Sequence, residues 1–409
     1  MADSQKQEPD AQASNKEAQG GGPSGKKGSP IGVIIASTGS PVAPEPEAVK
    51  EYLQRFLMDA RVRQVPVVPW WFILHCAILP KRKFASAERY KRVWTPEGSP
   101  LESTQAKLAS AIQDLFDTES VDEKAANPAN PANPANDAAA SVPADAAGAD
   151  AEKTKTHVLV RSASIYSEPS MEKVIAELKA AECARLVLVP LYPQSAYSCT
   201  LSVKDGFDCA LKSSGWNVPV SFIDHYCEEP LYLDAIAQSV RDAGFGQSEA
   251  DTLVMSYHSI PLKDERAGDT YRTQTQNTTR AVAQRLEVPA DQVAIGLEAC
   301  AGQNVRVAHG YQCVFGGHPE AWLSPLSVDI LSQWRGSGRH VFFCCPGFAI
   351  DCLETLDDIP NEIAPLYVGD GTARAEFTAI PCLNATDDNV KALYQVIQAK
   401  LKEENHVQR

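Results

Sequence analysis

Short apolar, β-branched runs alternate with segments of helical spacing along most of this 409-residue chain, and this alternation limits the fold more than any other feature. Strands that alternate with helices predict parallel sheets with helices on their faces. Buried parallel strands read as continuously apolar runs. The chain therefore predicts an α/β protein with doubly wound, Rossmann-like parallel sheets. The expected strands cover residues 31–36, 157–161, 185–191, 218–223, 252–257, 293–297 and 340–344, and the expected helices cover 44–58, 102–115, 170–181, 231–243, 271–286 and 390–401.

Length and local composition predict two domains with added biased segments. A chain of 409 residues is longer than one hydrophobic core usually supports. We place an N-terminal Rossmann-like domain at 31–240 and a C-terminal one at 241–385, followed by a C-terminal helix and tail at 386–409 that packs back across. Residues 1–30 carry almost no large apolar side chains, which predicts a disordered tail. The NPANPANPAN repeat within 118–155 predicts a low-complexity insertion, whose prolines exclude a helix in the repeat.

Net charge and cysteine content limit which binding partners and which cellular compartment are expected. A formal net charge of -14 and a pI near 5.1 oppose binding to a polyanion, so no nucleic-acid partner is expected. Eleven scattered cysteines, behind a start that lacks an apolar signal-peptide core, favour reduced thiols and a cytoplasmic location. No run reaches the roughly 18 apolar residues that would cross a membrane.

Two titratable residues stand where doubly wound sheets bind ligands, beyond the carboxyl ends of strands. His258 directly follows the run 252–257, and an imidazole with an ordinary pKa of about 6.5 is a natural general base. Glu354 follows the apolar run 340–344, and Asp351, three residues earlier, shares its helix face. The alternatives are a core histidine with satisfied hydrogen bonds, and an Asp351 cap with Glu354 completing a capping box.

Five motifs, in one order and at plausible spacing, carry a resemblance to a known family. They are GVIIASTGSPVAPEPEAVKEYLQRFLMDARV, SAERYKRVWTPEGSPL, LVLVPLYPQ, SYHSIP and CPGFAIDCLETL. Together they resemble the ferrochelatase family over about residues 31–385. The resemblance implies a chelatase-like fold with an active-site cleft between the two domains. It also implies that ferrous iron and a porphyrin are the substrates, that the product is protohaem when the ring is protoporphyrin IX, and that no cofactor is required.

The same resemblance implies roles for individual residues. His258 would receive pyrrole protons or present the metal, and Glu354 would face it across the pocket, so both are catalytic and metal-binding candidates. Asp351, Tyr166 and Tyr226 are substrate-binding candidates. Metallation must remove two N–H protons from the macrocycle and strip water from a cation, and a base with carboxylates nearby suits both tasks.

Residues 65–100 are expected to form a hydrophobic lip of the porphyrin cleft. The stretch 65–80 is the most apolar in the chain and carries Trp71 and Phe72, which are further substrate-binding candidates. Its three prolines should confine any helix to the middle of the stretch. A plain buried helix is the alternative. The lip also suits peripheral contact with the inner membrane, and Lys81, Arg82 and Lys83 supply positive charge for porphyrin propionates or lipid head groups.

Several positions depart from the usual family pattern. Ile165 stands where relatives commonly carry an arginine before the tyrosine, and Cys313 and Val314 stand where they carry serine and arginine. Cys352 occupies a position where some relatives have histidine. The departures at Ile165 and Val314 motivate one alternative, a catalytically decayed haem-binding or porphyrin-binding protein. Two alternatives within the class also stay open: a coproporphyrin ferrochelatase and another tetrapyrrole chelatase.

Four cysteines invite comparison with relatives that hold a [2Fe–2S] cluster, because four thiolates are the right number and type of ligand. Their spacing matches no cluster pattern, so no cluster is expected. The four are Cys344, Cys345, Cys352 and Cys382. The sequence leaves the oligomeric state undecided.

Overall fold

The computed structural model describes residues 28–63, 65–125, 157–314, 318–369 and 376–407. Most of the predicted N-terminal tail and the whole Asn-Pro-Ala repeat lie outside these residues. The helix that leads toward the repeat, α4 (Pro100–Ala125), continues several residues beyond the expected start of the insertion.

The N-terminal half contains a four-stranded parallel sheet in the order β2-β1-β3-β4. Its residues are apolar on both faces, because helices cover both: Val33 and Ile35 point toward α4, and Ile34 and Ala36 point toward α5 and α6. The strands are β1 (Ile31–Ser37), β2 (Val158–Ser164), β3 (Arg185–Pro190) and β4 (Val220–Phe222), and the helices named with α4 are α5 (Met171–Ala180) and α6 (Thr200–Ser213).

The C-terminal half contains a five-stranded sheet, also parallel, in the order β6-β7-β5-β8-β9. One face packs on α7 and α9, and the other packs on α11 and the π-helical segment η4. The strands are β5 (Asp251–His258), β6 (Val293–Ile295), β7 (Val307–Gln312), β8 (His340–Cys344) and β9 (Glu376–Ala379), and the helical segments are α7 (Pro230–Asp242), α9 (Tyr271–Arg285), α11 (Ser327–Trp334) and η4 (Glu354–Ile363). Two parallel sheets with helices on both faces confirm the predicted α/β class.

The β7 strand was absent from the expected strands, although it lies between β5 and β6. Its sequence VAHGYQ is only partly apolar, so it lacks the continuous run that marks a buried strand. Gly310 has a packing reason: a Cβ there would lie 2.7 Å from Ser327 Oγ and 2.9 Å from Ile330 Cδ1 of α11. The close approach of α11 therefore requires a glycine at position 310, and this glycine interrupts the apolar run by which a buried strand is recognised.

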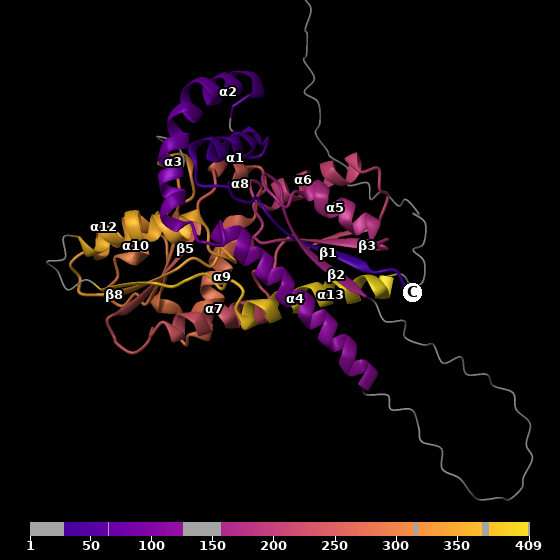
Figure 1. Cartoon of the computed structure of the whole chain (residues 1–409). Helices are drawn as coiled ribbons and strands as arrows, with labels where there is room; N and C mark the ends of the chain where they lie inside the picture. The colour runs from indigo at the N-terminus through magenta and orange to yellow at the C-terminus, as the bar shows by residue number, and fades with distance from the viewer. Residues whose placement is uncertain (1–27, 64, 126–156, 315–317, 370–375, 408–409) are drawn as a thin grey trace, which may run out of the picture.

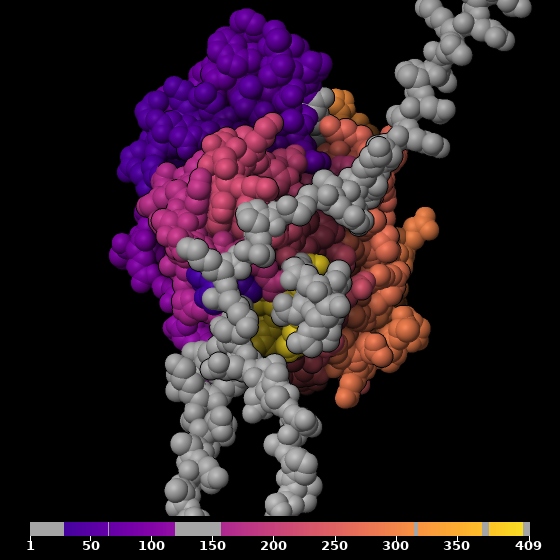
Figure 2. Space-filling model, turned by 90° about the vertical axis from the view of Figure 1, so that its right-hand side faces the viewer, coloured from indigo at the N-terminus to yellow at the C-terminus, as the bar shows by residue number. Residues whose placement is uncertain are grey.

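The last helix, α13 (Asp387–Val407), contacts both α4 of the first half and α7. The rings of Phe116 on α4 and Tyr394 on α13 lie 4.5 Å apart between centroids. Figure 1 shows α13 beside α4, and Figure 2 shows its yellow atoms between the magenta and orange halves of the molecule. One apolar core runs through both halves, and α13 contributes Leu393 and Ile397 to it.

The lip is a helical arm that stands away from both sheets (Figure 1). It consists of α2 (Val67–Ile73), a π-helical turn η1 (Leu74–Ile78) and α3 (Leu79–Val93), packed on α1 (Pro46–Met58). The expectation that prolines confine the helix is wrong here. The wider turn, in which the Leu79 N–H donates to the Leu74 carbonyl, lies directly before Pro80 and accommodates its ring. Within the described residues, no helix is long and apolar enough to cross a membrane.

Candidate active site

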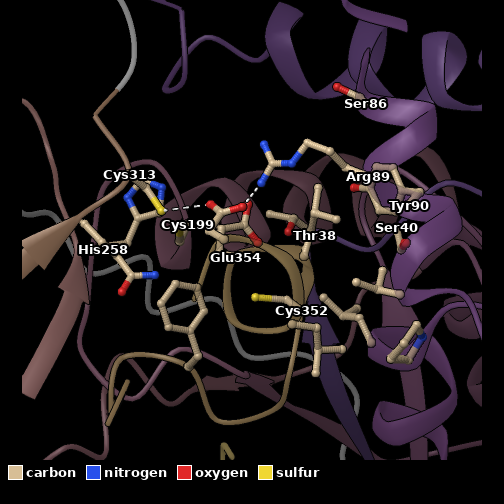
Figure 3. Close-up of a pocket in the computed structure, with 18 of the residues that line it drawn as sticks. Thr38, Ser40, Ser86, Arg89, Tyr90, Cys199, His258, Cys313, Cys352 and Glu354 are labelled. Atoms are coloured by element: carbon tan, nitrogen blue, oxygen red, sulfur yellow. Dashed lines mark hydrogen bonds and ion pairs between the residues drawn. The ribbon is translucent and has the colours of Figure 1, made fainter. Parts of the chain in front are cut away.

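A cavity of about 580 Å³ lies where the carboxyl ends of the two sheets meet the lip. Its wall comes from the turn after β1, from α1 and α3, from the ends of β5 and β7, and from the segment that leads into η4. Figure 3 shows His258 and Glu354 in this cavity, carried by elements of the C-terminal half, opposite the α3 side chains Arg89 and Tyr90. The sequence-predicted pair therefore shares one cavity.

His258 is the last residue of β5, so the strand fixes its backbone at the cavity wall. Its Nδ1 lies 2.6 Å from the Ser259 carbonyl oxygen. A carbonyl can only accept, so this contact places the proton on Nδ1 and leaves Nε2 as the basic nitrogen. Burial lowers the pKa of His258, and the negative charge of Glu354 acts in the opposite direction. The net lowering keeps the imidazole neutral at neutral pH, as a proton acceptor requires.

Glu354 begins the π-helical segment η4. In the wide π turn, residues four apart lie close to one face, and Glu354, Asp358 and Glu362 all line the cavity. Asp357, Asp358 and Glu362 form the only set of three or more possible metal ligands in the described parts of the chain whose ligand atoms all lie within 4.8 Å of one another. The cavity therefore offers carboxylate oxygens, which suit a hydrated divalent cation.

Two arginines of the lip bind the middle of η4. Arg92 Nε donates to Asp357 Oδ1 at 2.6 Å, and Arg89 Nε donates to Asp357 Oδ2 at 2.7 Å. The Asp357 side chain has no exposed surface. Burial acts to raise the pKa of Asp357, but the two guanidinium groups outweigh it and lower that pKa. Arg89 also pairs with Asp358, so the lip and the helix that begins with Glu354 are joined by charge.

Asp351 lies behind the cavity wall, where it holds the turn that precedes η4. Its carboxylate accepts hydrogen bonds from Thr355 Oγ1 at 2.8 Å, the Cys382 N–H at 3.2 Å and Asn384 Nδ2 at 2.7 Å. Asp351 therefore lies only three residues before Glu354, but its carboxylate is already hydrogen-bonded to the surrounding protein and does not line the cavity.

The two tyrosines predicted to contact substrate also lie outside the wall. The Tyr166 hydroxyl donates to Asp59 at 2.6 Å, and its ring packs 5.7 Å from Phe56, which does line the cavity. Tyr226 is buried beside Tyr232, with a centroid separation of 5.3 Å. Tyr166 therefore supports the wall from behind, and Tyr226 belongs to the core under α7.

Trp71 and Phe72 lie on α2, away from the residues that line the cavity. They are 45% and 58% exposed, and no α2 residue is buried. The alternative of a plain buried helix is therefore wrong for α2. Its apolar side chains face outward instead, next to those of Val67, Val68 and Ile73.

Several wall residues were not singled out from the sequence. Tyr52 and Phe56 of α1 are four residues apart and face the cavity together, which is a helical spacing that could have been noticed. Tyr90 and Arg82 come from α3 and Phe348 from the segment after β8. These aromatic faces and one cation give the wall the shape and charge to hold a flat ring with acidic substituents.

Three of the four departures from the family pattern lie in the wall, and one does not. Cys313 and Val314, directly after β7, and Cys352, before η4, line the cavity. Ile165 packs against α6, where a Cβ on Gly206 would lie 2.7 Å from Ile165 Cγ2.

The four cysteines compared with a cluster site are placed around the turn after β8. Cys344, Cys345 and Cys352 are buried and Cys382 is partly buried. Burial raises the pKa of each of them. These thiols do not form a set with ligand atoms all within 4.8 Å.

Comparisons with known proteins identify the family of the chain. A sequence model of the ferrochelatase family matches residues 30–141 and 134–401. The ferrochelatase of Marinobacter nauticus is 31% identical over 373 residues, which cover 91% of this chain and 87% of that protein. The ferrochelatase of Actinobacillus pleuropneumoniae serotype 5b is 32% identical over 372 residues, which cover 91% of this chain and 98% of that protein. The chain therefore belongs to the ferrochelatase family, the metal chelatases that insert iron into porphyrin.

Proposed function

We propose that this protein inserts Fe²⁺ into protoporphyrin IX to form protohaem, with His258 as the proton acceptor and Glu354 as the carboxylate opposite. The observation that carries the proposal is that these two residues, from separate elements, line one cavity and interact electrostatically. The reaction consumes one ferrous ion and one free-base porphyrin, and it releases two protons.

The chemistry follows from the charges in the cavity. A neutral His258 Nε2 accepts a pyrrole proton, and the ionised Glu354 stabilises the imidazolium that results. Asp358 and Glu362 continue the row of carboxylates along η4 and can replace water around an arriving cation. Loss of the two N–H protons leaves two negative charges on the macrocycle, and the divalent metal ion neutralises them.

The lip side of the wall suits the ring and its acid groups. Tyr52 and Tyr90 offer aromatic faces, and burial raises the pKa of both phenols, so they stay neutral. Arg82 lies in the same wall and is the cation that we assign to a porphyrin propionate.

Two other ring substrates and one other function remain as alternatives. The first two are that the ring is coproporphyrin or another tetrapyrrole, either of which would present a different set of acid groups to the lip. Loss of turnover, with retained porphyrin binding, is favoured by Val314, an apolar residue in the wall where relatives commonly carry a charge.

One assay separates these functions. The full chain is given Fe²⁺ under anaerobic conditions, or Zn²⁺ in air, with protoporphyrin or coproporphyrin, and the metalloporphyrin spectrum is followed. Faster turnover of protoporphyrin supports the proposal. Preference for coproporphyrin supports a coproporphyrin ferrochelatase, and tight porphyrin binding without turnover supports a protein that has lost insertion.

We further propose that the protein acts in the cytoplasm without a resident cofactor and that α2 contacts the inner membrane. The support for membrane contact is the group of exposed apolar side chains on α2, followed by the exposed basic residue Lys81. Freshly purified protein should lack visible absorption from an iron–sulfur cluster.

A further inference from the structure

Three of the eleven cysteines line the cavity, and they come from three different parts of the chain. Cys199 directly precedes α6, Cys313 directly follows β7, and Cys352 lies two residues before Glu354. Figure 3 shows all three in the same cavity as Glu354. Thiol sulfur is a soft ligand that favours Zn²⁺ and related cations, whereas carboxylate oxygen favours harder ones. The wall therefore contains donors of both kinds.

Cys313 contacts a carboxylate of η4. Its Sγ lies 3.7 Å from Asp358 Oδ2 and donates to it, a contact marked by a dashed line in Figure 3. Asp358 and Glu362 each offer an oxygen within 4.8 Å of the other. Sulfur and oxygen ligands thus already lie next to each other before any cation arrives.

The residue before Cys313 supplies a second, independent observation. Gln312 is only 4% exposed and lines the cavity. Its Oε1 accepts from Ser256 Oγ at 2.7 Å, but its Nε2 has no nitrogen or oxygen acceptor among the described residues and lies against the Cys313 sulfur. A buried amide donor without a strong acceptor is rare. This one lies beside the sulfur of Cys313, where a metal-bound thiolate or a metal-bound water would accept its hydrogen bond.

The position of Cys313 is also fixed relative to the proposed catalytic base. Gln312 of β7 lies directly opposite His258 of β5 in the strand pairing. Cys313 is the next residue after Gln312 in the sequence, so its backbone lies close to that of His258. A cation held by Cys313 and Asp358 therefore sits at the same end of the sheet as the imidazole.

We propose that Cys313 determines metal specificity: its thiolate, with the Asp358 carboxylate, binds thiophilic divalent cations such as Zn²⁺ and Cd²⁺ more tightly than Fe²⁺. Binding exchanges one thiol proton, which passes to solvent, for one sulfur–metal bond, and no electron is transferred. Zn²⁺ and Cd²⁺ then occupy the cavity of the porphyrin-free protein and compete with Fe²⁺. The competition rests on the proposed function, whereas the binding itself needs neither porphyrin nor turnover.

The direct test is titration of the reduced, full-length protein with Cd²⁺ in the absence of porphyrin. We expect a saturable ultraviolet charge-transfer band from thiolate to cadmium. Cys313→Ser should remove the band and weaken binding by at least about tenfold, since even loss of an outer-shell partner costs that much. Asp358→Asn should keep the band and weaken binding. Cys209→Ser is the matched control, because Cys209 is an exposed thiol of α6 outside the cavity wall.

Two results overturn the proposal: a wild-type protein without saturable cadmium binding, or a band that survives in Cys313→Ser and disappears in Cys199→Ser or Cys352→Ser. If Cys313→Ser fails to fold, alkylation of the unmodified protein replaces it, and Cd²⁺ should protect Cys313 but not Cys209. In the insertion assay, Cys313→Ser should tolerate more Cd²⁺ than wild type. Binding without any metal insertion would refute only the proposed function, and insertion without binding would refute only the role of Cys313.

Discussion

Arg92 of the lip and Asp357 of η4 form a two-point ion pair, with Nε 2.6 Å from Oδ1 and Nη2 2.9 Å from Oδ2. Because the Asp357 side chain is buried and Arg89 binds the same carboxylate, the lip and the helix that begins with Glu354 are held in a fixed relation. These ion pairs link the lip to the element that carries the proposed catalytic carboxylate.

Asp357→Asn should lower kcat of metal insertion by about 10- to 100-fold, because small displacements of a catalytic group are costly. Asn361 should continue to contact position 357, so the helix should persist. The measurement is insertion kinetics beside a thermal unfolding scan. Asp205→Asn, which removes the surface pair with Arg61, is the control and should leave kcat unchanged. Equal effects of the two substitutions would refute the link between lip and helix.

His258→Ala should reduce insertion by about 100- to 10,000-fold, the range for loss of a general base. Porphyrin binding should remain, because the rest of the wall is intact. Fluorescence quenching of the porphyrin measures binding, and the metalloporphyrin spectrum measures insertion. Near-normal insertion by this variant would rule out His258 as the proton acceptor.

Glu354→Gln should slow insertion by roughly 100-fold or more, because it removes charge from the site where an imidazolium forms. The side-chain shape is kept, so the unfolding temperature should change little. Glu298→Gln, an exposed glutamate outside the cavity wall, is the matched control. A variant as fast as this control would exclude a catalytic role for Glu354.

The pH profile should report His258. The neutral form is the active one, so kcat/KM falls as pH falls through the pKa of His258. Burial lowers that pKa, which places the acidic limb below the ordinary histidine value of about 6.5. Glu354 acts to raise the pKa, so Glu354→Gln should move the limb to still lower pH. Movement of the limb to higher pH would contradict the interaction between the two residues.

Trp71→Ser combined with Phe72→Ser should weaken binding to anionic lipid vesicles by about tenfold or more, given the apolar area that each ring can bury. Sedimentation with vesicles measures it. Leu231→Ser is the control, because Leu231 is an exposed apolar residue of α7. Insertion with porphyrin supplied in detergent should stay near the wild-type rate. Equal vesicle binding by the two variants would remove α2 as the contact surface.

The sequence by itself determined the α/β class, because buried parallel strands read as continuous apolar runs. It also placed His258 and Glu354 after two such runs, where ligands bind in these sheets. That the two residues face each other was implied by the family resemblance and not by the spacing. The sequence did not determine β7, since Gly310 and the polar residues around it interrupt the apolar run.

Only the tertiary structure decided which neighbouring residues face the cavity. Asp351 and Glu354 are only three residues apart, yet Glu354, the first residue of the π-helical η4, faces the cavity. The Asp351 carboxylate instead accepts hydrogen bonds from Thr355, Cys382 and Asn384. In the same way, the Tyr166 hydroxyl already donates its hydrogen bond to Asp59. The physical reason is that hydrogen-bond partners come from distant parts of the chain, so local spacing cannot predict which polar side chain is already satisfied and which one is left for the substrate.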